Sequence, residues 1–292
     1  PPVQAPAIPA FKSARSWRSS RRVTRKFGLE QLRDPQGLPI SLRLLRELHG
    51  ILLAEGRGAE QQPGEFRRTQ NWIGGTRPGN AAFVPPPPHL LDDLLGGLEQ
   101  YLHNSSVPSL VRAGIAHAYF ETLHPFLDGN GRIGRLLVPL LLINDGELSE
   151  PHLYVSLYFK QHRAEYYARL QATRDEDDWL GWMRFFLEAV AVTANQAVDA
   201  ARAAVEIYKG HRKAVDDLAN AGSVLRVLAF LRRRPMVTSK MLVERISISA
   251  PTANNALTAL VDAGIIEEIT GKKRGRVYAY RGYIKALAAA AD

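Results

Sequence analysis

The stretch that decides the fold is His124-Pro-Phe-Leu-Asp-Gly-Asn-Gly-Arg-Ile-Gly-Arg135, where a polar, glycine-rich turn runs directly into an apolar segment. Residues 136–143 are apolar almost without interruption, which predicts a buried core helix, and Pro139 would kink that helix. Amphipathic patterns predict further helices over residues 39–53, 89–103, 109–123, 153–159, 161–173 and 178–208. The main part of the chain is therefore predicted to be mainly α.

The backbone of this stretch is suited to binding an anion. Gly129 and Gly131 flank Asn130, so the chain can turn with its N–H groups pointing inward at the N-terminus of a helix, where the helix dipole also favours negative charge. Arg132 and Arg135 lie three residues apart on the first turn of that helix and can point at one anion. The pattern predicts a phosphate site.

Two further side chains of the stretch add chemistry. Asp128 beside a phosphate site is electrostatically unfavourable unless a cation lies between them, and Mg²⁺ is the natural cation. His124 is the group here that can accept a proton near neutral pH, and Phe126 is expected to anchor the loop in the core. A glycine-rich turn with His124 and Asp128 as helix caps is the plainer alternative. All these features within one short stretch favour phosphoryl or nucleotidyl transfer.

The stretch resembles the signature of Fic-domain proteins, His-x-Phe-x-(Asp/Glu)-Gly-Asn-Gly-Arg-x-x-Arg, and matches it at every fixed position. The similarity extends from about Leu38 to Glu188 and includes the segments PGEFRRTQNWIGG, FVPPPP and LYFKQHRAEYYARL. The resemblance implies an all-α Fic core that carries a β-hairpin flap over the site. It also implies a protein adenylyltransferase, which uses ATP and Mg²⁺ to transfer AMP to a Tyr, Thr or Ser hydroxyl of a target protein.

The resemblance also implies roles for single residues. His124 would deprotonate the target hydroxyl, which attacks the α-phosphate in line while pyrophosphate leaves, and Asp128 would hold Mg²⁺. The two arginines would bind the β- and γ-phosphates. The residues implied to bind ATP within the signature are Gly129, Asn130, Gly131, Arg132, Ile133, Gly134 and Arg135. Another phosphate-bearing donor, such as UTP or CDP-choline, stays open because the signature reads phosphates more than bases.

The flap is expected at residues 72–84, two short extended pieces around a glycine-rich turn, and would align the target's main chain by strand addition. Its target-docking residues would be Ile73, Gly74, Gly75 and Thr76. Tyr167 is expected to contact the nucleotide from outside the signature, with Tyr158 and Tyr166 as weaker candidates. Helix packing is the alternative role for these tyrosines.

Many Fic proteins carry an inhibitory helix with the pattern (Ser/Thr)-x-x-x-Glu-(Gly/Asn), whose glutamate pairs with the second signature arginine. Residues 1–40 contain no match, since Glu30 has Lys26 four residues before it. Residues 51–56 end in Glu-Gly but begin with Ile. Either self-inhibition in cis is missing or the N-terminus is incomplete, and Arg135 is expected to be free for the γ-phosphate.

The net charge of +9 is concentrated at the two ends of the chain, with +6 over residues 1–30 and +7 over residues 219–292. Such basic ends favour a polyanion partner, with nucleic acid first, although a solvated surface is the alternative. The pattern of the C-terminal part is that of a winged helix-turn-helix domain. Its predicted helices and strands cover residues 223–232, 238–245, 249–264, 265–269 and 276–281.

This basic module carries a second functional hypothesis, a DNA-binding transcriptional regulator whose Fic core senses a nucleotide. Polar side chains on the third helix could meet bases or phosphates, and the cationic wing tip suits a phosphate backbone. The candidate DNA-binding residues are Thr252, Asn254, Asn255, Lys272, Lys273, Arg274 and Arg276. The alternative is a protein–protein or homodimerisation module, because fold does not fix function.

Composition adds further expectations. The sequence contains no apolar run long enough for a membrane span, no secretory signal pattern and no cysteine, so a cytoplasmic location is expected and disulfides are excluded. The predicted organisation is a flexible basic segment over residues 1–30, a Fic catalytic domain over 31–195, a helical linker over 196–218 and a winged helix-turn-helix domain over 219–292.

Overall fold

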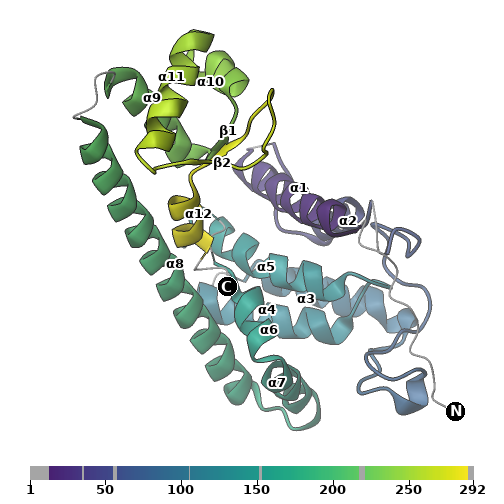
Figure 1. The fold of residues 1–292 in the computed structure, drawn as a ribbon. Helices are drawn as coiled ribbons and strands as arrows, with labels where there is room; N and C mark the ends of the chain where they lie inside the picture. The colour runs from purple at the N-terminus through teal and green to yellow at the C-terminus, as the bar shows by residue number, and fades with distance from the viewer. Residues whose placement is uncertain are drawn as a thin grey trace, which may run out of the picture. The chain divides into compact units, whose positions relative to one another are not determined.

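The fold was examined in a computed structural model, which describes residues 13–34, 36–54, 58–104, 106–150, 153–216 and 221–288, with side chains from residue 23 onward. The chain divides into two units, Pro1–Val190 and Ala191–Asp292 (Figure 1). Each unit has a hydrophobic core of its own. None of the helices in these described ranges combines the length and the apolar character that a membrane span requires.

The first unit is built around α4 (Ser109–Leu123) and α5 (Asn130–Asn144), which pack against each other. The apolar run after the signature forms the buried part of α5, as predicted, and the helix continues through Pro139. The buried apolar residues of α5 are Ile133, Leu137, Val138, Pro139, Leu140, Leu141 and Leu142. Because this helix is fixed in the core, its N-terminus, which carries the signature, is fixed as well.

Other helices surround this pair. They are α2 (Leu42–Leu53), α3 (Leu91–Leu102), α6 (Val155–Gln161), α7 (Arg163–Asp175) and the first part of α8 (Trp179–Asp216). Figure 1 shows α3, α4 and α5 side by side, in agreement with their contacts. Gly114 lets α8 approach α4 closely, since a Cβ at this position would lie 2.8 Å from the Phe186 ring. The indole N–H of the buried Trp182 donates to the Gly114 carbonyl at 2.9 Å.

The N-terminal segment differs from its prediction. Residues 1–30 were expected to be flexible, but α1 (Ser13–Arg33) is a helix that packs on α2 and α5, while residues 1–12 lie outside the described part. Its buried face carries the small residues Thr24 and Gly28, and a Cβ on Gly28 would lie 3.2 Å from Leu140. The segment is rich in arginine and serine, and this composition favoured a loose structure over the helix that the chain forms.

The second unit has the element order of a winged helix. It contains α9 (Ala221–Arg233), β1 (Met236–Val237), α10 (Ser239–Ile246), α11 (Ala250–Asp262), β2 (Glu267–Glu268), β3 (Tyr278–Ala279) and α12 (Arg281–Ala288). β3 pairs antiparallel with both other strands in the order β1-β3-β2, with Ala279 opposite Met236 on one side and Glu267 on the other. β1 and α12 were not predicted, because two residues of strand and a short terminal helix give little periodic signal.

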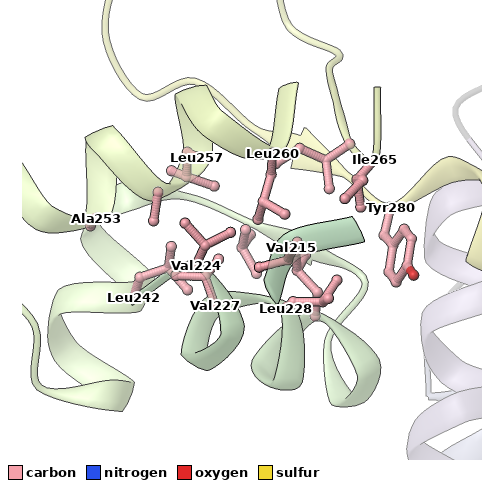
Figure 2. Close-up of a cluster of buried hydrophobic side chains, with 14 of the residues drawn as sticks. Val215, Val224, Val227, Leu228, Leu242, Ala253, Leu257, Leu260, Ile265 and Tyr280 are labelled. Carbon is pink, nitrogen blue, oxygen red and sulfur yellow. The ribbon is translucent and has the colours of Figure 1, made fainter. Parts of the chain in front are cut away.

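The core of this second unit collects apolar side chains from all its helices. Figure 2 shows Val224, Val227 and Leu228 of α9 facing Leu257 and Leu260 of α11. Ala204 and Val215, from the C-terminal part of α8, are buried in the same core. The segment predicted as a helical linker is therefore helical, but part of it belongs to the core of the second unit instead of separating two domains.

Candidate active site

The signature, residues 124–135, lies at the junction between α4 and α5. α4 ends at Leu123, and His124 follows it in the left-handed conformation with φ 46°. Gly129 is also left-handed, with φ 84°, and is the N-cap of α5. These two turns reverse the chain, so that the His124 side chain and the N-terminus of α5 face one cavity.

This cavity has a volume of about 470 Å³. It is lined by signature residues, by one residue of the flap and by α4 and α7. The lining residues are Ile73, Glu121, His124, Leu127, Asp128, Gly129, Asn130, Gly131, Arg132, Arg135, Tyr166, Tyr167, Leu170 and Arg174. Most of the residues predicted from the signature are thus brought together around one space.

His124 has the surroundings of a neutral base. Its Nδ1 lies 3.3 Å from the carbonyl oxygen of Glu121, and because a carbonyl only accepts, Nδ1 carries the proton and Nε2 keeps its lone pair. Burial lowers the pKa of His124 to about 4, while the hydrogen bond to Glu121 opposes this shift and the like charges of Arg174 and Arg67 add to it. The imidazole is therefore unprotonated at neutral pH.

Asn130 holds the loop closed with its side chain. Its Oδ1 accepts from the Phe126 N–H at 2.8 Å, and its Nδ2 donates to the Phe126 carbonyl at 2.7 Å. Both residues are almost completely buried. Asn130 was predicted to line the anion site, and it does border the cavity, but its amide group is engaged by the backbone of Phe126.

Arg67 and Asn71, from the segment after α2, hold the carbonyl groups of the signature loop, residues 123–128. The buried guanidinium of Arg67 donates to the carbonyl oxygens of His124 at 3.0 Å and Leu123 at 3.2 Å. The backbone N–H of Arg67 donates to the carbonyl oxygen of Pro125 at 2.8 Å. Asn71 Nδ2 donates to His124 and Phe126 at 3.1 and 3.0 Å. Buried carbonyl groups are costly when unpaired, so these donors fix the loop.

His49 of α2 supports the same loop from its other side. Its ring stacks on Phe126 with centroids 3.8 Å apart and planes 7° from parallel. Nδ1 accepts from the Gly64 N–H at 2.8 Å, so Nε2 must carry the proton that it shares with the Asp128 carbonyl at 2.9 Å. Burial is the largest cause of the lowered pKa of His49, which keeps this neutral form.

Three guanidinium groups face the cavity, those of Arg132, Arg135 and Arg174. Arg132 forms an ion pair with Asp128 at 3.2 Å, and the other carboxylate oxygen of Asp128 accepts from the Gly129 N–H at 2.6 Å. Among the described residues, no ion pair involves Arg135. That Arg135 serves the γ-phosphate stays a prediction.

Gly134, between the two signature arginines, packs against Glu121 of α4. A Cβ at position 134 would lie 2.7 Å from the Glu121 Oε1. The carboxyl group of Glu121 is buried, and burial raises its pKa against the opposing charges of Arg135 and Arg174. Neither Gly134 nor Ile133, which is fully buried, lines the cavity. Both were predicted to bind ATP, but they lie on the face of α5 that is turned to the core.

The three candidate tyrosines differ in position. Tyr167 lines the cavity and is 48% exposed, and its contact with a nucleotide stays a prediction. Tyr166 also borders the cavity but is buried, and its hydroxyl lies 3.0 Å from Nε2 of His117. Tyr158 does not line the cavity and stacks on His162.

The flap, residues 72–84, has less regular structure than the predicted hairpin. Ile73 and Phe83 form an isolated antiparallel bridge, in which the Ile73 N–H donates to the Phe83 carbonyl at 2.9 Å. At the tip, Asn80 Oδ1 accepts from the N–H groups of Thr76 and Arg77, both at 2.9 Å. Of the predicted docking residues, Ile73 faces the cavity, whereas Gly74, Gly75 and Thr76 are exposed.

In the second unit, the candidate DNA-binding residues lie on two exposed surfaces. Asn254 and Asn255 are exposed on α11, and Thr252 is half-buried with its hydroxyl 2.7 Å from that of Ser249, the N-cap of this helix. The cationic residues of the loop between β2 and β3 are all exposed: Lys272, Lys273, Arg274 and Arg276. Glu268 shapes this loop by accepting from the N–H groups of Thr270 and Gly271.

Comparison with known sequences agrees with this geometry. The model of the Fic/DOC family matches residues 39–142, which contain the signature, the loop donors and the flap. The chain carries a Fic domain. The model of the MarR family matches residues 220–276, so the second unit carries a MarR-family winged helix.

Relatives of the Fic domain include proteins named protein adenylyltransferase Fic. The one from Drosophila virilis is 35% identical over 161 residues, which are 54% of this chain and 30% of that protein. The one from Culex quinquefasciatus is 35% identical over 163 residues, 55% of this chain and 29% of that protein. The chain thus spans about 30% of the length of the relatives it matches.

A solved structure, Fic-1 (residues 134–508) from C. elegans, shares the fold. It superposes with a TM-score of 0.51 at 23% identity, over 68% of this chain and 55% of that one. At this identity the likeness concerns the fold alone.

Sequence reasoning missed the Fic residues that support the signature from outside it. Arg67 and Asn71 lie in the segment PGEFRRTQN, whose resemblance to the family implies no role for them, and the pattern around His49 indicates only a helix. Glu121 and Arg174 also line the cavity without having been predicted. A charged or imidazole side chain within an apolar pattern was the one signal that could have pointed to them.

Proposed function

We propose that the Fic domain transfers AMP from ATP to a Tyr, Thr or Ser hydroxyl of a target protein. One observation carries the proposal: the neutral His124 faces the same cavity as the N-terminus of α5 and the guanidinium groups of Arg132 and Arg135. The relatives named protein adenylyltransferase support it.

The residues give each part of this reaction a place. Nε2 of His124 accepts the proton of the target hydroxyl, whose oxygen forms a bond to the α-phosphorus. The bond from the α-phosphorus to the bridging oxygen breaks, and pyrophosphate leaves with the electron pair. The N–H group of Gly131 and the guanidinium charges of Arg132 and Arg135 stabilise the negative charge on the phosphates. Because burial disfavours the imidazolium, His124 releases its proton readily after transfer.

Asp128 fits the chemistry of a magnesium ligand. Mg²⁺ in nucleotide sites usually takes one or two carboxylates, with phosphates and water in the remaining positions. Within the described ranges no group of three or more His, Cys, Asp or Glu residues could hold a metal alone, so the nucleotide would have to complete the coordination. When bound there, Mg²⁺ would supply positive charge beside the phosphates.

Radiolabel at two positions of ATP tests the reaction. Label at the α-phosphate should appear on protein, either on the chain itself or on an added target, whereas label at the γ-phosphate should not. Transfer of the γ-label would mean a kinase-type reaction and would overturn the proposal. Excess unlabelled UTP or CDP-choline should leave the transfer unchanged if ATP is the donor, and full competition would identify another donor.

For the second unit we propose a DNA-binding role. The match to the MarR family and the exposed cationic wing favour it over a purely protein-binding module. Affinity for duplex DNA should fall with salt, and replacing Lys272 and Lys273 by alanine should reduce the slope of log affinity against log salt by about two. Gel-shift titrations at several salt concentrations measure this slope, and a complete lack of salt-sensitive binding would refute the role.

A further inference from the structure

We infer that Arg174 is a positioning residue that holds the flap, residues 72–84, over the active site. Its guanidinium carbon lies 3.9 Å from the centroid of the Phe83 ring. This stack is shorter than the other arginine–aromatic pairs of the described residues, such as Arg25 over Tyr154 at 4.9 Å. It connects α7 to the flap, which lie far apart in the sequence. The effect of the flap position on the alignment of a target protein rests on the proposed function.

The arginine itself is well fixed on its core side. Nε donates to the Thr122 hydroxyl at 3.1 Å, and Nη1 donates to the Gln171 side chain at 3.3 Å. Nη2 lies 3.4 Å from the carbonyl oxygen of Glu121, the same carbonyl that receives the Nδ1 proton of His124. Arg174 therefore contacts the last turn of the helix that ends at the base, and a planar guanidinium can make these bonds while its face stays against a ring.

The flap has few other contacts with the core. Residues 74–80 are exposed, and Trp72 and Val84 at its two ends are 40% and 42% exposed. The two residues of the isolated bridge, Ile73 and Phe83, are both half-buried, in contrast to the exposed tip of the flap. The backbones of Ile73 and Phe83 are hydrogen-bonded to each other. A contact that holds the Phe83 side chain in place therefore also holds Ile73, which lines the cavity.

Arg174 thus fixes the flap at Phe83, while Arg67 and Gln70 bind the carbonyl groups of Pro86 and Pro85 directly after the flap. Cation–π contacts are strengthened when the cation is partly desolvated, and burial does lower the pKa of Arg174. Loss of this stack should release the flap and leave the signature loop intact, because that loop is held by Arg67, Asn71 and His49.

Hydrogen–deuterium exchange on the full chain tests this. The N–H groups of Ile73, Ala82 and Phe83 are hydrogen-bonded across the flap, so their exchange reports its closure. Arg174→Ala and Phe83→Leu should each speed their exchange by about tenfold, the size expected for one partly buried cation–π contact. The double variant should be no faster than either single variant, because both changes remove the same stack.

Two controls separate positioning from folding. Arg169→Ala, at a half-buried position of the same helix that pairs with Glu165 and Asp178, should leave flap exchange unchanged. Exchange in α3 should stay as in the wild type in all variants. If Arg174→Ala does not fold, Phe83→Leu still tests the contribution of the stack, because Phe83 is only half-buried. Unchanged flap exchange in Phe83→Leu, or additive effects in the double variant, would overturn the inference.

Nucleotide binding and AMP transfer are measured separately. Calorimetric titration with a non-hydrolysable ATP analogue should give the same affinity, within about twofold, for wild type and Phe83→Leu, since the ring is not in the phosphate site. Transfer of the α-label should fall in Phe83→Leu and recover in Phe83→Trp, which keeps an aromatic face. A large loss of analogue affinity in Arg174→Ala with unchanged flap exchange would make Arg174 a phosphate ligand. Absence of any transfer in the wild type would refute the proposed function but leave the exchange result to decide the inference.

Discussion

The signature loop and the flap face the same cavity but are stabilised in opposite ways. In the loop, the carbonyl groups of residues 123–126 and 128 each accept a hydrogen bond from a donor outside the loop or from Asn130. The flap has one isolated bridge, an asparagine-closed tip and the stack on Arg174. The site thus combines a half that is held by many hydrogen bonds, the loop, with a half that is held by few, the flap.

This difference has a simple physical reading. Phosphate chemistry requires the base and the anion site to be fixed within fractions of an ångström, so buried carbonyl groups are given permanent partners. A surface that receives a protein strand must expose unpaired backbone groups, which forbids the same degree of internal pairing. Changes in the loop should therefore cost both chemistry and stability, whereas changes in the flap should cost little stability.

The largest effect should follow from removing the base. His124→Ala should lower α-label transfer by about 10²–10⁴-fold, the usual contribution of general acid–base catalysis. The affinity for a non-hydrolysable ATP analogue should stay near that of the wild type, because the anion site remains. Label transfer and calorimetry on the same preparation measure both quantities. Transfer at the wild-type rate would show that another group accepts the proton.

Breaking the support of the loop should have the next largest effect. Arg67→Ala leaves the carbonyl groups of Leu123 and His124 without their guanidinium donor, and should lower the free energy of unfolding of the first unit by roughly 2–4 kcal/mol. Arg68→Ala, its exposed neighbour, is the matched control and should change little. Urea unfolding followed by tryptophan fluorescence would compare them, because all four tryptophans lie in the first unit. Equal midpoints for the two variants would contradict the role of Arg67.

The pH dependence of AMP transfer should show that the base, His124, is buried in the signature loop. Burial lowers the pKa of His124 from 6.5 to about 4, and only the neutral imidazole can accept the proton. The rate should therefore stay level from about pH 8 to about pH 5, where a histidine of ordinary pKa would already have lost about thirtyfold. Initial rates of α-label transfer in buffers of constant ionic strength measure this. A decline that begins near pH 6.5 would show that the base is accessible to water.

The smallest effect should come from a matched pair of asparagines. Asn130 and Asn80 both close a turn through two hydrogen bonds, but Asn130 is buried and Asn80 is exposed. Asn130→Ala should cost roughly 1–3 kcal/mol of unfolding free energy because it leaves a buried N–H unpaired. Asn80→Ala should cost no more than about 0.5 kcal/mol because water replaces the side chain. Chemical denaturation of both variants measures the difference, and similar costs would abolish the contrast between loop and flap.

The sequence predicted the elements that depend on local spacing. The helix after the signature, the two arginines near its N-terminus and the winged-helix order could all be predicted from neighbouring residues, although Arg135 lies on the second turn of α5 and not on the first. The donors that hold the loop could not, because Arg67 and His49 act on residues far along the chain, and no local pattern records such a contact. The helix α1 was not predicted, because its many arginine and serine residues favour a loose segment, whereas its packing on α2 and α5 is a tertiary contact. The flap was predicted from the resemblance to Fic proteins. That its tip is exposed and that its two sides are joined by one isolated bridge can be seen only in the structure.

The contact between Gly134 and the buried carboxyl group of Glu121 has a consequence for how this sequence can change. Position 134 is one of the open positions of the signature pattern, yet any side chain there would meet Glu121 Oε1 at 2.7 Å. An alanine at 134 requires the buried Glu121 side chain to shift, and a shorter residue at 121 removes this contact. The two positions therefore form a compensating pair: in a randomised library selected for folding, a side chain at 134 should be recovered together with a small or apolar residue at 121, and glycine at 134 with glutamate.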